Sequence, residues 1–348
     1  MIVRHVSTYP ELPRKSALRR CFENLYIYLR DGDPCAAYDG LGLDIKGRPL
    51  DDFVGNHVWM RFLDRKLTPE NWRSATALQK LVLRGKSLIP ILQDKFLFWC
   101  FMDANGIPVV PVLAHTACGE IFEHSSAGAI ARHTRFFVKP AGEMCGSDAR
   151  PVTAKDGKLY EGGRETSLAA IASSGANLVF QPFVENHPDI KAFNPGTLNT
   201  MRFVTCRNRQ GGLEPWDPGM MRIGRAGSTV DNFAKGGIGV GIDPEGRLEK
   251  YGFSHDKELN YVKMERHPDS GIAFEGRPIP FYHDAVALAL KAHALFPTLD
   301  AIGWDVAITS DGPLLLEGNH TWDIEMLQVV HRKGSAARFK EIFGESPR

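Results

Sequence analysis

Hydrophobic residues recur at helical spacing near the start of the chain and again before residue 105. The first such series has apolar positions three or four residues apart: Leu18, Cys21, Phe22, Leu25 and Leu29. The run Asp31-Gly32-Asp33-Pro34 ends it. Further helices are predicted over residues 69–83 and from Asp94 to Asn105, where Gly106 follows. We therefore predict a mainly helical N-terminal region over residues 1–90.

From about residue 135 the pattern changes to short apolar strands and tight turns. Strands are predicted at FFVKP (136–140), NLVFQPFV (177–184), TLNTMRFVTC (197–206) and PWDPGMMRIG (215–224), and the segment 107–113 is also strand-like. Hairpins are predicted around Asp156-Gly157 and around 243–246, and helices over 166–175, over 283–296 and twice near the C-terminus. Helices that cover a mostly antiparallel sheet in two modules indicate an α+β fold.

The segment 302–319 predicts a hairpin whose polar residues face each other. Apolar residues alternate through Ile302, Trp304, Val306 and Ile308, and Ser310-Asp311-Gly312 is typical of a three-residue loop. With that loop Thr309 pairs with Pro313, and counting outward places Asp305 opposite Glu317. Like charges directly across a strand pair are destabilising, so we expect a compensating cation.

Asn319 lies two residues beyond Glu317 and is expected on the same face. Two carboxylates and an amide oxygen are the hard ligands that Mg²⁺ accepts. The alternative is an ordinary solvated hairpin that carries surface acids, and this stretch alone does not decide between them.

Composition narrows the classes of protein to consider. With 348 residues, 43% hydrophobic residues and a net charge of +1, the chain is typical of a globular enzyme and has no basic field for nucleic acid. Its six cysteines show no metal-like spacing, which favours reduced thiols in a cytoplasm. No signal-peptide or membrane-spanning stretch is apparent, so we expect a cytoplasmic protein without membrane association.

Several other residues are candidates whose individual signals are weak. Lys139 ends an apolar strand before a loop that contains Gly142, Gly146 and Ser147, which suits a polyphosphate, although the loop has no Walker A pattern and also reads as a plain surface turn. Gln181 interrupts an apolar strand beside Pro182, and alone this favours an edge strand. For Lys95, Arg202, Arg222 and Arg225, taken singly, solvated or ion-paired side chains are the default interpretation.

The order of these segments along the chain is more specific than any one of them. DKFLFWCFMDANGIPVVP, FFVKPAGEMCGS, LVFQPFV, TLNTMRFV and GWDVAITSDGPLLLEGN together resemble the ATP-grasp superfamily, over about residues 88–330. NFAKGGIGVGID and FNPGTLNTMRFVT are similar to its sugar-transfer-associated branch. The resemblance implies an ATP-grasp fold, with an N-terminal subdomain over residues 91–184 and a C-terminal subdomain over residues 185–348.

The resemblance also implies roles for individual residues. Lys95 and Lys139 match the phosphate-binding lysines, and the loop from Gly142 through Gly146 to Ser147 matches the one over the triphosphate. Gln181, Phe183 and Val184 match the adenine-binding hinge, and Arg202 matches a basic residue that faces the γ-phosphate. Asp305, Glu317 and Asn319 match the ligands of two Mg²⁺ ions, for which Mn²⁺ is an alternative.

Two departures from the family pattern leave roles open. The hinge has Gln181-Pro182 where many members carry acids, so the ribose-binding acid is assigned to Asp189, with Glu185 as competitor. Gly303 stands where some ligases carry a substrate-side arginine, a role left to Arg222 or Arg225.

The implied activity is that of an ATP-dependent carboxylate ligase. It would form an acyl-phosphate and join a small-molecule carboxylate to a nucleophile, with release of ADP and phosphate, in polysaccharide or natural-product assembly. The residue inventory supplies charge neutralisation without a protein nucleophile, which suits phosphoryl transfer. A grasp-fold kinase and a nucleotide-binding protein without ligase activity are the alternatives. The oligomeric state is open, with a homodimer as one alternative.

Overall fold

The computed structural model describes residues 29, 88–124, 130–142, 149–228, 230–255, 261–320, 322 and 324–344. The helices predicted before residue 88 lie outside the described residues except for Leu29, and so do Gly146 and Ser147. The boundaries predicted at 90/91 and 184/185 stay predictions.

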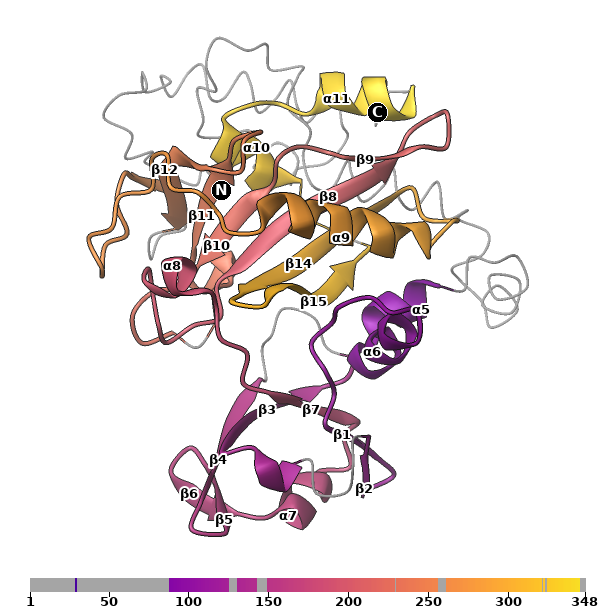
Figure 1. Cartoon of the computed structure of the whole chain (residues 1–348), viewed down its shortest axis with the longest axis vertical. Helices are drawn as coiled ribbons and strands as arrows, with labels where there is room; N and C mark the ends of the chain where they lie inside the picture. Colours follow the sequence, from indigo (N-terminus) through magenta and orange to yellow (C-terminus); the bar gives the residue numbers. More distant parts are fainter. Residues whose placement is uncertain are drawn as a thin grey trace.

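An antiparallel sheet of seven strands forms the lower lobe in Figure 1. Its strands are β1 (Ala114–Ala117), β2 (Glu120–Glu123), β3 (Arg135–Pro140), β4 (Arg150–Lys155), β5 (Lys158–Glu161), β6 (Arg164–Thr166) and β7 (Leu178–Pro182), in the order β2-β1-β7-β3-β4-β5-β6. The short helix α7 (Leu168–Ala172) is capped by the Ser167 hydroxyl, and η3 (Ile130–Arg132) precedes β3. One face of the sheet carries the core residues Phe136, Val138 and Phe180.

A second antiparallel sheet of eight strands forms the upper lobe. It contains β8 (Thr200–Arg207), β9 (Leu213–Pro215), β10 (Met220–Ile223), β11 (Ile238–Ile242), β12 (Leu248–His255), β13 (Tyr261–Met264), β14 (Ala301–Thr309) and β15 (Gly312–Asn319). The order is β13-β12-β11-β10-β8-β14-β15, and β9 pairs with β8. The α+β expectation is confirmed.

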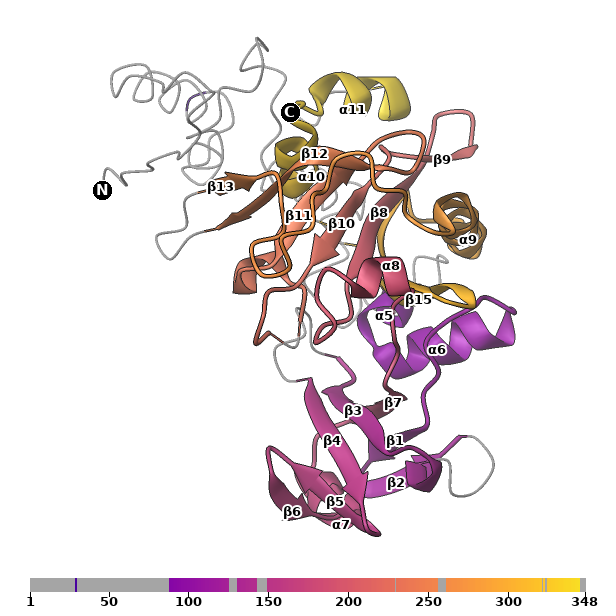
Figure 2. The same cartoon turned by 60° about the vertical axis from the view of Figure 1, so that its left-hand side comes forward.

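Helices cover both faces of this second sheet, as Figure 2 shows from the side. The helix α9 (Tyr282–Ala294) packs through Leu288, Ala289 and Ala292 against the face that carries Phe203 and Trp304. On the other face lie α10 (Glu325–His331) and α11 (Ala336–Phe343), which pack around Trp216 and Trp322. Two short elements, α8 (Pro188–Lys191) and η4 (Phe233–Lys235), lie in the connecting loops.

The helices α5 (Ile89–Gln93) and α6 (Lys95–Ala104) lie between the two sheets in both views. Asp94 begins α6 because its carboxylate accepts hydrogen bonds from the backbone N–H groups of Phe96 and Leu97. The helix predicted from Asp94 to Asn105 is therefore confirmed. Leu92, Phe98 and Met102 enter the core of the second sheet, while Phe96 and Trp99 pack against Val179 of the first.

Two strand predictions need correction. The edge-strand interpretation of Gln181 is wrong because β7 lies between β1 and β3, with Pro182 at its last pair, opposite Phe136. The strand-like segment 107–113 contributes only a bridge between Val109 and Leu315, because Pro108 and Pro111 lack the N–H groups that a ladder needs.

The β14–β15 hairpin reaches its register by a different route from the predicted one. Thr309 pairs with Gly312, not Pro313, so the loop has two residues, and Gly312 adopts φ 121° at its end. A β-bulge then intervenes between the pairs Val306–Leu315 and Asp305–Glu317. The extra residue on β15 turns Glu317 away from the face of Leu315, since one added residue reverses the side-chain alternation.

Candidate functional site

A row of polar residues crosses the second sheet on a single face. Arg202 of β8 is directly opposite Asp305 of β14, which in turn is directly opposite Glu317 of β15. Residues directly opposite on neighbouring strands point to the same face. The bulge in β15 therefore brings Glu317 to the face of Asp305, as predicted, and Asn319 follows two residues later.

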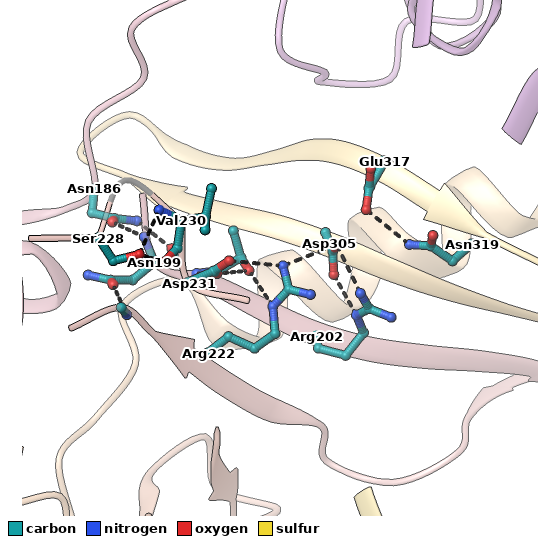
Figure 3. A network of polar contacts seen from close by, with 12 residues as sticks. Asn186, Asn199, Arg202, Arg222, Ser228, Val230, Asp231, Asp305, Glu317 and Asn319 are labelled. Atoms are coloured by element: carbon teal, nitrogen blue, oxygen red, sulfur yellow. Dashed lines mark hydrogen bonds and ion pairs between the residues drawn. The ribbon is translucent and has the colours of Figure 1, made fainter. Parts of the chain in front are cut away.

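Asp305 is held by two arginines from two strands (Figure 3). Arg202 forms a bidentate contact, with Nε 2.5 Å from Oδ1 and Nη2 3.1 Å from Oδ2. Arg222 of β10 places Nη2 3.3 Å from Oδ2. All three side chains are largely buried. Burial opposes ionisation of Asp305, but the two guanidinium groups outweigh it and lower its pKa.

A second carboxylate, Asp231, lies on the far side of Arg222 and was not anticipated from the sequence. Arg222 Nη2 is 3.1 Å from Asp231 Oδ1, and the backbone N–H of Thr200 donates to Oδ2 at 2.9 Å. The Thr200 hydroxyl also donates to Oδ2 and accepts from Arg222 Nε. The only sequence signal was the position of Asp231, immediately before the NFAKGG segment.

Glu317 differs electrostatically from its neighbour. Burial and the adjacent Asp305 carboxylate both raise the pKa of Glu317. Asn319 Nδ2 lies 3.4 Å from Glu317 Oε1, and a flip of this amide would present its oxygen instead. The two carboxylates and the amide fit a hard cation, because the buried Asp305 and the half-buried Glu317 repel each other and a divalent ion would relieve that repulsion.

Lys139 faces this acidic row from the first sheet. Its Nζ donates to Gln181 Oε1 at 2.9 Å, across neighbouring strands on the sheet face opposite the Phe136 core. Burial lowers the pKa of Lys139 to about 8; Glu317 acts to raise it, and Lys95 contributes to the lowering. These long-range effects indicate that both lysines and Glu317 lie around one region.

A cleft joins α5 and α6 to the end of β15. Its lining residues are Leu92, Gln93, Lys95, Phe98, Glu317, Gly318, Asn319 and His320. The structure thus brings Lys95 and two of the three predicted metal ligands to the same cleft, although they are more than two hundred residues apart in sequence.

The segment after β7 connects the two sheets. The Phe183 ring stacks on Phe137 at 4.6 Å and carries the Arg135 guanidinium 4.0 Å from its centroid. Val184 is half-buried. Asn186 anchors the segment to the second sheet through reciprocal hydrogen bonds with the backbone of Asn199, at 2.8 and 2.7 Å.

The remaining predicted residues lie outside this network. Arg225 forms a bidentate ion pair with Asp269, at 2.8 and 3.0 Å, on the part-exposed surface. Asp189 is exposed at the start of α8, 3.5 Å from His187, and Glu185 is paired with Lys191 at 2.8 Å. Gly142 is exposed after β3. The structure brings none of these into contact with Asp305.

The absence of a side chain at position 303 has a structural reason. A Cβ atom at this position would lie 2.5 Å from Trp322 Cβ, so a side chain there would displace the buried indole. An arginine is therefore excluded at this position, and Arg222 is the second guanidinium that reaches Asp305.

Two negative findings concern the described residues alone. In that part of the chain no helix is both long and apolar enough to cross a membrane. Across the same residues, no group of three or more His, Cys, Asp and Glu could hold a metal ion.

Comparison with solved structures finds similar chains at low identity. An N5-carboxyaminoimidazole ribonucleotide synthetase from Thermotoga maritima is 13% identical, with 70% of this chain and 47% of that chain covered and a TM-score of 0.37. An ADP complex of another such synthetase is 11% identical, with 78% of this chain and 58% of that chain covered and a TM-score of 0.43. D-alanyl-alanine synthetase A from Vibrio cholerae is 14% identical, with 69% of this chain and 59% of that chain covered and a TM-score of 0.40.

The matched region spans about half the length of the first two of these structures. Among curated proteins none matches the chain. The family profile described as sugar-transfer associated ATP-grasp matches residues 79–343, which is most of the chain. The chain therefore belongs to the sugar-transfer associated ATP-grasp family and has the ATP-grasp fold.

Proposed function

We propose that the protein is an ATP-dependent carboxylate ligase that works through an acyl-phosphate. The observation that carries the proposal is the meeting of two lysines, two arginines and two carboxylates between the lobes. Such an arrangement supplies charge neutralisation and positioning, which are what phosphoryl transfer requires of a protein.

In this proposal the triphosphate lies along the cationic side of the site. Lys95 and Lys139 hold phosphate oxygens, with the loop from Gly142 through Gly146 to Ser147 above them. Asp305, Glu317 and Asn319 hold the Mg²⁺ that accompanies ATP, which supplies charge stabilisation at the transferred phosphoryl group. Two ions, and Mn²⁺ as a substitute, are part of the proposal.

Adenine would bind at the segment from Gln181 to Val184. Because the Phe183 ring is already stacked on Phe137 and Arg135, the backbone after Pro182 is the better candidate for contacts to the base. The ribose acid is proposed to be Asp189, with Glu185 as the alternative.

The acid substrate would bind near the arginines. Its carboxylate oxygen attacks the γ-phosphorus, the bond to the β-phosphate oxygen breaks, and ADP leaves. The nucleophile then attacks the acyl carbon and phosphate leaves. Arg202 faces the transferred group, and the contact of Arg222 with Asp305 favours it over Arg225 as the second arginine.

ADP release measured against a panel of acids and nucleophiles, with mass spectrometry of products, tests this function. We expect equal amounts of ADP, free phosphate and a condensed product. A phosphorylated acceptor without free phosphate would instead establish a kinase. ADP binding without turnover on any pair would favour the non-catalytic alternative.

A further inference from the structure

Asp231 is the buried acid that the proposed chemistry does not use. It has only 6% of its surface exposed, and its two carboxylate oxygens have different partners. Oδ1 contacts Arg222, and Oδ2 accepts from both the backbone and the hydroxyl of Thr200. A carboxylate bound on both oxygens is fixed in orientation.

The loop around Asp231 is fixed from both sides. Before it, the Thr197 hydroxyl donates to the Ser228 carbonyl at 2.7 Å, and the Ser228 hydroxyl donates to the Val230 carbonyl at 2.6 Å. After it, the chain turns back so tightly that any Cβ atom at Gly237 would collide with the Asp231 carbonyl. Asp231 therefore has little freedom to follow Arg222 if Arg222 moves.

Arg222 lies between two acids, and one of them is a candidate metal ligand. Its Nη2 is 3.1 Å from Asp231 Oδ1 and 3.3 Å from Asp305 Oδ2, as Figure 3 shows. The same nitrogen serves both acids, with one N–H available for each, so the two contacts together set the position of the guanidinium. Loss of charge at Asp231 would release the guanidinium to Asp305, where it would compete with a cation for the carboxylate oxygens.

The formal charges also indicate that loss of the Asp231 charge would weaken cation binding at Asp305. The network contains three carboxylates (Asp231, Asp305 and Glu317) and two guanidinium groups (Arg202 and Arg222), which leaves one negative charge in excess. Without the charge of Asp231 the excess is zero. The sign of this change does not depend on what the lysines across the cleft contribute.

We infer that Asp231 is a positioning residue that shares the Arg222 guanidinium with Asp305, so that Asp305 does not receive the full charge of Arg222 and the Asp305–Glu317 pair stays able to accept a divalent cation. The inference rests on the proposed function, because it concerns the same candidate metal ligands. It assigns to the loop 228–237 a role in the metal affinity of the site, although Asp231 itself contacts neither Glu317 nor Asn319 in Figure 3.

The test is a Mn²⁺ titration followed by the electron paramagnetic resonance signal of the free ion, with and without ADP. Asp231→Asn keeps size and shape and removes the charge. We expect Mn²⁺ to bind about tenfold more weakly to this variant, since a charge in a buried network acts through a low effective dielectric. ADP binding measured in chelator should stay within about threefold of wild type.

A double variant separates positioning from a merely structural role. Adding Arg222→Gln to Asp231→Asn removes the released guanidinium and restores the charge balance, so Mn²⁺ affinity should return to within about threefold of wild type. If Asp231 provided only a structural contact, the double variant would bind Mn²⁺ more weakly than either single variant. Glu214→Gln is the matched control. It removes the acid of a 2.9 Å ion pair between Glu214 of β9 and Arg338 of α11, and it should leave Mn²⁺ affinity unchanged.

Thr200→Val provides a second variant if Asp231→Asn does not fold. It removes the hydroxyl that contacts both Asp231 and Arg222 but keeps the backbone donor, and it should weaken Mn²⁺ binding in the same direction by a smaller factor. Wild-type Mn²⁺ affinity in both folded variants would overturn the inference and leave the proposed function intact. Absence of Mn²⁺ binding by the wild type, with and without ADP, would overturn the metal site and the inference together.

Discussion

Asp305 and Glu317 are directly opposite each other across β14 and β15; Asp305 is buried and Glu317 is half-buried, and only Asp305 has arginine partners on both of its oxygens. The pKa of Asp305 is accordingly lowered, and that of Glu317 is raised by burial and by Asp305. Arg202 and Arg222 also favour the charged form of Glu317, but burial and Asp305 outweigh them, so the surrounding protein relieves the repulsion less at Glu317 than at Asp305.

Glu317→Gln removes this repulsion without changing the shape of the side chain. In chelator we expect the melting temperature to stay the same or rise slightly, since like charges directly opposite each other destabilise a strand pair. ADP release should fall by about two orders of magnitude or more, because a ligand of the proposed ions is lost. Near-wild-type turnover would contradict the metal assignment, and a large loss of stability in chelator would indicate an unrecognised basic partner.

ATP binding should depend on a divalent ion. The candidate ligands are all oxygens, and two of them are carboxylates that would repel a bare triphosphate. Calorimetry should give an ATP affinity at least about tenfold higher in millimolar Mg²⁺ than in chelator. Mn²⁺ is expected to replace Mg²⁺ in the same titration. Equal affinities in chelator and in Mg²⁺ would rule out the proposed site.

Lys139 should make nucleotide binding sensitive to alkaline pH. Burial lowers its pKa to about 8, so the ammonium group of the ligand-free protein loses its proton as pH rises through that value. Lysine binds a phosphate only when charged, and ADP affinity should therefore decline above about pH 8. Lys139→Arg stays charged over this range and should give a flat profile up to pH 9.5.

Lys139→Ala is the companion variant. It should weaken ADP binding about tenfold or more, and it should cost no more than about 1–3 kcal/mol of stability through the unpaired Gln181 amide. A variant that melts far below wild type and still binds ADP normally would show that Lys139 is a structural residue.

His293 should make the fold sensitive to acid. Its Nε2 donates to the Leu299 carbonyl at 2.9 Å, and its Nδ1 lies 2.7 Å from the Thr205 hydroxyl, which donates to it when the buried ring is neutral. Burial lowers its pKa to about 4 from 6.5. The unfolded chain thus binds a proton that the folded protein excludes, and stability falls as pH drops from about 6.5 towards 4, by roughly 3 kcal/mol at the limit.

Urea denaturation of wild type and His293→Gln at several pH values measures this effect. The variant loses some stability at every pH, so the informative quantity is the difference between the two slopes. We expect the wild type to lose stability faster between pH 6.5 and 4. Parallel slopes would mean that the imidazole accepts a proton in the folded protein.

The local patterns of the sequence were sufficient for many of the elements. Asp94 and Gly106 mark the ends of α6 because a cap and a helix stop act within a few residues of the chain. Alternation in β14 indicated the strand and its two faces for the same reason. The resemblance to ATP-grasp proteins came from the order of short segments and is confirmed by the family match.

The register of the β14–β15 hairpin is a feature that such local patterns do not predict. The loop was predicted one residue too long, and the bulge in β15 adds one residue, so the two cancel and Asp305 still meets Glu317. A bulge depends on what the strand packs against on each side: Leu315 enters the core while Glu317 turns to the opposite face. No local pattern in the sequence encodes that choice.

Only the tertiary structure decided which polar side chains distant in sequence form ion pairs and hydrogen bonds with each other. From the sequence the role was left to Arg222 or Arg225, with Arg225 the one selected as a catalytic residue; strand pairing placed Arg222 beside Asp305 and left Arg225 with Asp269. The position of Asp231 before the NFAKGG segment did not reveal its role, because that role depends on Thr200 and Arg222, which reach it only when β8 pairs with β10. Side-chain chemistry and short-range periodicity are properties of the sequence, whereas charge compensation in a buried site is a property of neighbours that folding brings together.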